Sequence, residues 1–132
     1  MKTLNQKLKV SESIPLQTIV ESLNGTAIDM RPSNDEQYES AIIIAGIGVL
    51  GDQDETTIKI EESDSATFAS GNTVAKGGEE TVVTASSTNE FQIERTKRYI
   101  RAVVTVVDGD TPSAPVYAVA ILSEMETPHP VA

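Results

Sequence analysis

The sequence lacks cysteine and tryptophan and has a single histidine among its 132 residues. The missing cysteines exclude disulfides, thiolate zinc sites and cysteine nucleophiles. With two phenylalanines and three tyrosines, the chain has few aromatic platforms on which bases or sugars could stack. The histidine, His129, lies between two prolines close to the last residue, where no fixed neighbours would orient an imidazole for proton transfer. These absences argue against an enzyme.

Basic residues are also scarce, with 10 Lys and Arg against 20 Asp and Glu, for a net charge of −10. Binding to nucleic acid or to an anionic membrane requires a surplus of positive charge. The longest apolar run, residues 41–50, is too short to cross a bilayer. We therefore expect a soluble protein with no nucleic acid and no membrane among its partners.

Short runs rich in Ile, Val and Thr, separated by polar and glycine-bearing stretches, make up most of the chain. This pattern is typical of an all-β protein, and the length fits one domain. We predict a single-domain β-sandwich or small antiparallel barrel of about eight strands, with an extended N-terminal arm. The predicted strands are Thr26–Met30, Glu39–Leu50, Thr56–Glu62, Ala66–Ser70, Thr81–Thr84, Glu90–Glu94, Arg98–Val107 and Val116–Ser123.

Alternation predicts which residues face the core. In the predicted strand Arg98–Val107, one face carries Ile100, Ala102, Val104 and Val106, and we assign this face to the core. The segment that follows, Asp108–Pro115, is dense in turn-forming residues. It predicts a hairpin that pairs the final two strands antiparallel.

Three segments are expected along the chain. Residues 1–24 form an N-terminal arm and lead-in, residues 25–123 the β-domain, and residues 124–132 a flexible C-terminal tail with two prolines. The arm carries Lys2, Lys7 and Lys9 and no acid in its first ten residues. Leu16–Leu23 has helical spacing over about two turns, but it is short and contains β-branched residues.

Two motifs imitate functional sites. Gly46–Gly51 matches G-x-G-x-x-G, but a dinucleotide site requires a helix after the last glycine, and here acids and then an alternating strand follow. The glycines fit a bend or bulge in a strand better. Asp52, Asp54 and Glu55 could supply calcium ligands, but the EF-hand order is absent and a solvated loop is the commoner case. We predict no cofactor, no metal and no catalytic residues.

Arg95, Lys97, Arg98 and Arg101 form the internal basic cluster, with Glu90 and Glu94 nearby. Two interpretations stand side by side. The cluster contacts the acidic surface of a partner, or its members form ion pairs with neighbouring acidic strands.

Thr96–Val106 and Ser113–Leu122 resemble segments of small structural proteins found in the heads of tailed bacteriophages. Gly25–Asp29, Ala41–Ala45 and Ile58–Asp64 are similar to further segments of that group. The resemblance implies a non-enzymatic decoration or cement protein, or a head-fibre component. Such a protein is made in the host cytoplasm and binds the outer surface of the virion capsid, with the major capsid protein as partner. It also implies a homo-oligomer, with a trimer preferred and a monomer possible.

Under this resemblance the basic residues become candidates for capsid contact: Lys2, Lys7, Lys9, Arg95, Lys97, Arg98 and Arg101. The acidic loop Asp52–Glu55 and the lysines of the N-terminus depart from the pattern of the group. Other functions stay open at this point. They are a head-fibre or spike base, a tail or neck protein, and a carbohydrate-binding module, which the scarcity of aromatic residues disfavours.

Overall fold

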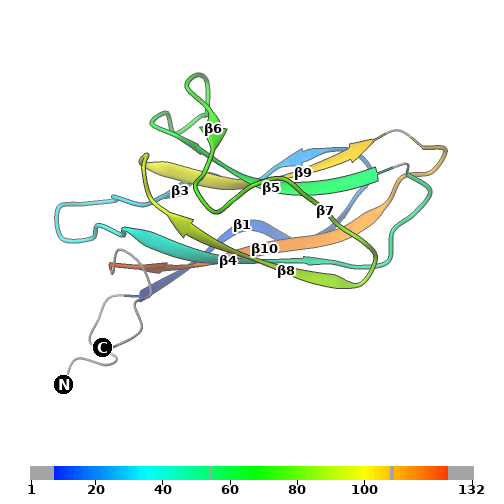
Figure 1. Ribbon diagram of the computed structural model, residues 1–132, viewed down its shortest axis with the longest axis horizontal. Coiled ribbons are helices and arrows are strands. Elements are labelled where there is room, and N and C mark those ends of the chain that lie inside the picture. Colours follow the sequence, from blue (N-terminus) through cyan, green and yellow to red (C-terminus); the bar gives the residue numbers. More distant parts are fainter. Residues whose placement is uncertain (1–7, 54, 108, 125–132) are drawn as a thin grey trace.

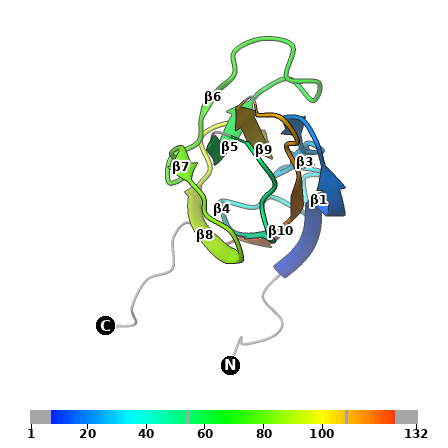
Figure 2. The ribbon, with the colours of Figure 1, turned by 90° about the vertical axis from the view of Figure 1, so that its right-hand side faces the viewer.

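Two antiparallel sheets stack face to face in the computed structural model, which describes residues 8–53, 55–107 and 109–124 (Figure 1). Seen along the sandwich, β4, β8 and β10 form one layer, and β5 and β9 form the other (Figure 2). The described residues contain ten strands and no helix. The predicted all-β, single-domain sandwich is therefore confirmed. None of the described segments is a helix long and apolar enough to span a membrane.

The four-stranded sheet has the order β1-β10-β4-β8, and its strands are β1 (Leu8–Ile19), β10 (Ala114–Ser123), β4 (Ser40–Ile47) and β8 (Ser87–Glu94). The six-stranded sheet is built on the long pair β9 (Tyr99–Val107) and β5 (Glu55–Ser63). Its short strands are β2 (Leu23–Asn24) and β3 (Ile28–Asp29), both beside β9, and β6 (Thr73–Val74) and β7 (Thr81–Val82), both beside β5.

The core lies between the sheets and follows the period-two alternation of the sequence. Ile100, Ala102 and Val104 of β9 are fully buried, as predicted, and Val106 packs at the edge of the core. Ile43 of β4 faces them from the opposite layer and is equally buried. Burying one such isoleucine stabilises the fold by about 2 kcal/mol.

The prediction that the final two strands form a hairpin is wrong. β9 pairs with β5, β2 and β3, whereas β10 pairs with β1 and β4, so the chain crosses from one sheet to the other between them. The connection is fastened to residues 51–53 instead: the Gly51 amide donates to the Ser113 carbonyl at 2.7 Å, and the Gln53 side chain bonds the Ser113 backbone at 3.2 Å. Turn-forming residues mark where a chain turns, but they do not determine which strands pair.

The described part of the expected N-terminal arm is extended, and it forms β1 along the edge of the four-stranded sheet. Pro15 lies within this strand and is accommodated where the register shifts, because an edge strand has amides to spare. The helical turn considered for Leu16–Leu23 is wrong, since β1 continues to Ile19. Residues 1–7, and residues 125–132 of the predicted tail, lie outside the described residues.

The predicted strand Ala66–Ser70 is also wrong, because this segment forms a loop. Phe68 takes a left-handed backbone conformation with φ of 54° and turns its ring inward, where it is 5% exposed. Phe68 therefore covers a neighbouring surface from a loop, whereas Ala66 and Ala69 are exposed. In the glycine motif, Gly46 lies in β4 with no helix after it, and the Tyr117 ring occupies the space that a Cβ at Gly46 would fill.

Candidate functional site

Three arginines of the predicted basic cluster form ion pairs with carboxylates that are distant in sequence. Arg95 binds Glu39 at 2.7 Å, Arg98 binds Asp29 at 2.9 Å, and Arg101 binds Glu61 at 2.9 Å. The interpretation that the cluster forms ion pairs with neighbouring acidic strands is confirmed for Arg98 and Arg101, whose partners lie in β3 and β5, whereas the partner of Arg95 lies just before β4. A capsid contact through these arginines requires an acidic partner that competes with, or adds to, the existing carboxylates.

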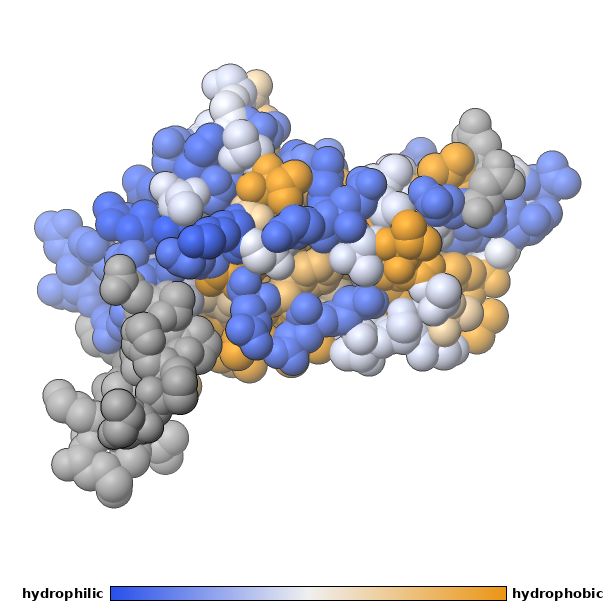
Figure 3. Space-filling view, viewed as in Figure 1, coloured by the Kyte–Doolittle hydropathy of each residue, from blue (hydrophilic) through white to orange (hydrophobic). Residues whose placement is uncertain are grey.

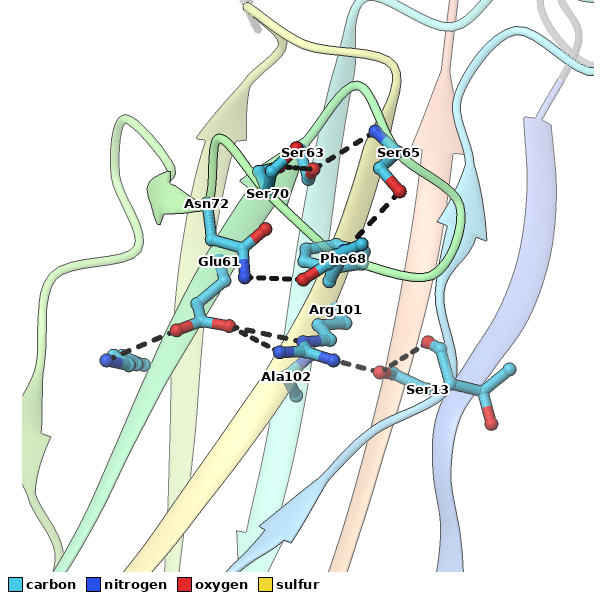
Figure 4. Close-up of polar contacts among 12 residues, drawn as sticks. Ser13, Glu61, Ser63, Ser65, Phe68, Ser70, Asn72, Arg101 and Ala102 are labelled. Carbon is cyan, nitrogen blue, oxygen red and sulfur yellow. Dashed lines mark hydrogen bonds and ion pairs between the residues drawn. The ribbon is translucent and has the colours of Figure 1, made fainter.

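Arg101 is the most enclosed member. Its Nε and Nη2 donate to the same Glu61 oxygen at 3.2 and 2.9 Å, and the guanidinium lies 4.2 Å from the centre of the Phe68 ring (Figure 4). Lys59 approaches the other Glu61 oxygen at 3.3 Å. The Arg101 side chain is only 15% exposed, so this group is an enclosed part of the outer surface of the six-stranded sheet.

Arg98 holds Asp29 through two parallel hydrogen bonds of 2.9 Å each. These bonds lower the pKa of the Asp29 carboxyl below its ordinary value, against the opposing effect of partial burial, and the Arg31 amide adds a further hydrogen bond. The same pairing raises the pKa of Arg98. Lys97 donates to the Gly71 carbonyl at 2.6 Å. These contacts tie the start of β9 to β3 and to the loop that follows β5.

Arg95 and Arg98 also line an open polar hollow of about 840 Å³, together with Arg31, Asn34, Asp64 and Thr96 among others. The hollow contains groups of both charge signs, and its arginines already bind carboxylates. Of the predicted lysines, Lys9 lies 3.9 Å from Glu36 and is about half exposed. Lys2 and Lys7 lie outside the described residues.

The outer face of the four-stranded sheet is apolar at its centre, which the sequence analysis missed. Ile42 and Ile44 of β4 lie directly opposite Ile121 and Val119 of β10, and all four side chains are partly exposed. At the β1 edge, Val10 is 67% exposed opposite Ile121. We call these five residues the apolar stripe. Figure 3 shows the molecule from the side on which β7 and β8 lie, where hydrophobic residues appear among the hydrophilic ones.

The stripe continues into a groove of about 660 Å³ at one end of the sheet. Leu8, Ile42 and Ile121 supply apolar walls, and Glu94 lies at the rim in an ion pair of 3.1 Å with Lys76. A strand with one face in water usually alternates apolar and polar residues. A run of consecutive apolar residues therefore indicates a strand that is apolar on both faces of its sheet. Such runs are Ala41–Ala45 and Val116–Leu122.

The acidic loop after β4 shows no assembled metal site in the part of the chain that the structure describes, where no three His, Cys, Asp or Glu side chains converge. Asp52 instead pairs through its backbone with Thr111 at 3.0 Å. Asp54 lies outside the described residues.

The sequence matches no protein-family model, and no curated protein matches it significantly. Among solved structures, a chain from infectious bursal disease virus, Gx strain, is similar at 10% identity with a TM-score of 0.49, covering 96% of this chain and 34% of the viral one. The protein thus spans about a third of the length of that viral chain. A chain from Bacillus endospore appendages, described as a novel family of disulfide-linked pili, is similar at 16% identity with a TM-score of 0.38, covering 86% of this chain and 89% of the other.

Proposed function

We propose that the protein is a non-enzymatic structural component of a tailed-phage virion, which binds the exterior of the assembled capsid and reinforces it as a decoration or cement protein. The observation that carries this proposal is the apolar stripe on the outer face of the four-stranded sheet. A contiguous apolar surface on a chain of high net charge is typical of a protein contact. The sequence resemblance to phage head proteins suggests that this contact is made with the major capsid protein.

The rest of the surface fits a structural protein that bears mechanical stress and catalyses no reaction. Arg95, Arg98 and Arg101 bind carboxylates that lie 56, 69 and 40 residues away along the chain. Such links between distant segments stiffen the domain. Many copies that bind only the assembled lattice stabilise it by mass action.

The oligomeric state and the role of the basic residues are part of the proposal. A trimer is preferred over a monomer, on the resemblance alone. Lys2, Lys7 and Lys9 are proposed to add contacts at the capsid surface, beside the main contact made by the apolar stripe. An acidic capsid surface would attract them electrostatically and speed association.

The test uses heads of the encoding phage that were prepared without this protein. Purified protein is mixed with expanded and with unexpanded heads, and bound copies are measured by cosedimentation. We expect saturable binding to expanded heads and a rise in the temperature at which they release DNA. Absence of binding to both kinds of head would contradict the proposal, and imaging that places the protein only below the portal would reassign it to the neck or tail.

A further inference from the structure

We propose that the apolar stripe docks an apolar capsid segment that carries lysine or arginine on both sides of its apolar residues. This inference rests on the proposed function and specifies its partner. The stripe lies between two exposed carboxylates, those of Glu12 on β1 and Glu90 on β8. Apolar burial would supply affinity, and the two carboxylates would select the partner and its orientation.

One row of the sheet defines the geometry. Glu12 pairs with Val119, Val119 with Ile44, and Ile44 with Glu90, so the four residues lie side by side across four strands. With strands roughly 4.8 Å apart, the two glutamate Cα atoms are separated by roughly 14 Å. Two aliphatic side chains fill the interval. The row therefore presents two negative charges, one at each end, with an apolar centre between them.

The neighbouring row extends the apolar area. Val10, Ile121 and Ile42 lie side by side and end at Gln92 of β8. Beyond it, the groove ends at Glu94, which holds Lys76 in its ion pair. Lys76 lines the groove, and Glu94 already matches its charge. Lys9, between Leu8 and Val10 on β1, lies 3.9 Å from Glu36.

Glu12 and Glu90 differ from the carboxylates that stabilise the fold. Glu39 and Glu61 each bind an arginine at 2.9 Å or less. By contrast, Glu12 and Glu90 form no ion pair with any residue that the structure describes. Their charges remain free to attract a basic partner.

The same two charges disfavour other occupants. A second copy stacked on this face would bring acidic margins together on chains that each have a net charge of −10, and like charges in a contact are repulsive. Nucleic acid and anionic lipid are repelled for the same reason. A basic-flanked apolar segment is the occupant that matches both the charge and the apolar centre.

The experiment measures binding to expanded heads that lack the protein, using two double variants and a matched control for each. Glu12→Lys with Glu90→Lys reverses the margin charges, and Glu55→Lys, on an exposed residue of the other sheet, is its control. Ile44→Thr with Val119→Thr makes the stripe polar while keeping β-branched side chains. Its control is Val82→Thr, at a valine of the other sheet that is 60% exposed.

We expect each double variant to bind roughly tenfold more weakly or worse, and each control to bind within about twofold of the wild type. Wild-type binding should weaken as salt rises, and the charge-reversed variant should lose the part of this dependence that Glu12 and Glu90 supply. Thermal melting of each variant establishes that it is folded. If the threonine variant were unfolded, the charge-reversed variant alone would test the docking surface, because both of its substituted residues are exposed and should not affect folding.

Three other outcomes separate the inference from the proposed function. If the wild type does not bind heads at all, the proposed function fails. If the wild type binds and both double variants bind equally well, the function stands and this docking surface is overturned. If the wild type is oligomeric by light scattering and the stripe variants are monomeric, the stripe is covered by a second copy and the inference is likewise overturned.

Discussion

The two outer faces of the sandwich solve the same problem, that of exposing a sheet to water, in opposite ways. On the six-stranded sheet, Lys59 and Arg101 both bind the Glu61 carboxylate, and Phe68 covers the guanidinium of Arg101. On the four-stranded sheet the corresponding central positions hold Ile44 and Val119. The first face satisfies its own charges, whereas the second leaves apolar surface in contact with water.

This difference indicates that one face contributes to the stability of the folded chain and the other to binding. Cross-strand ion pairs and the cation–π contact act within the folded chain. Exposed apolar area contributes little until a partner covers it, when each Å² removed from water is worth about 25 cal/mol. We therefore expect substitutions on the six-stranded sheet to change stability, and substitutions on the apolar stripe to change binding.

Among substitutions on the two outer faces, the largest loss of stability is expected from Arg101→Met. Methionine keeps much of the apolar length but removes two hydrogen bonds to Glu61 and the contact with the Phe68 ring. We expect the free energy of unfolding to fall by about 2 kcal/mol, measured by urea denaturation. The control is Arg31→Met, because Arg31 lies 3.7 Å from Glu39 and is 43% exposed. Equal effects of the two substitutions would show that the enclosure of Arg101 adds nothing.

A smaller loss is expected on the apolar stripe. Ile44→Thr with Val119→Thr replaces two partly exposed side chains, so the free energy of unfolding should fall by less than about 1 kcal/mol. The adjacent Ile43→Thr is the control, because Ile43 is fully buried and its loss should cost about 3 kcal/mol. If the double variant were as unstable as the control, the stripe would be part of the core, and the contrast between the two faces would disappear.

The fold was predictable where a local pattern decides it. Alternation placed Ile100, Ala102 and Val104 of β9 in the core, because a strand with one face in water has a period of two residues. Partner choice is not local. Nothing in the turn-rich segment after β9 specifies that the chain crosses to the other sheet, and the crossing is fixed by bonds to residues 51–53.

Two further elements show the same limit. Proline is disfavoured within strands, yet β1 accommodates Pro15 at a register shift. The buried Ser13 of the same strand donates to the Thr26 carbonyl and accepts from the Ala102 amide. Phe68 lies in a segment that reads as a strand, but it turns inward from a loop to cover Arg101. In both cases a tertiary contact overrides the local preference of the backbone.

The candidate site was predictable in part. The sequence identified Arg95, Arg98 and Arg101 as a cluster, but their acidic partners lie too far away along the chain for spacing to reveal them. The stripe left a signal in the consecutive isoleucines of β4. Such a run is typical of a strand covered on both sides. In this chain the outer side of β4 stays partly exposed, at Ile42 and Ile44.

The smallest effect is expected at Asp29, and it depends on pH. Because its hydrogen bonds lower the pKa in the folded state, the carboxylate stabilises the fold above its unfolded pKa of about 3.9. This contribution is lost as the pH falls through the lower folded value. Asp29→Asn should therefore melt slightly below the wild type from pH 5 to 8, and the gap should close as the pH falls below about 4.

The matched control for Asp29→Asn is Glu55→Gln, at an exposed carboxylate for which we expect no gap at either pH. Melting curves followed by circular dichroism at pH 7 and pH 3 give all four differences in one experiment. A gap at Asp29 that persisted unchanged at pH 3 would mean that asparagine disturbs the backbone turn to Arg31 rather than the ion pair. The Arg98 bridge would then contribute no more than the exposed charges that border the apolar stripe.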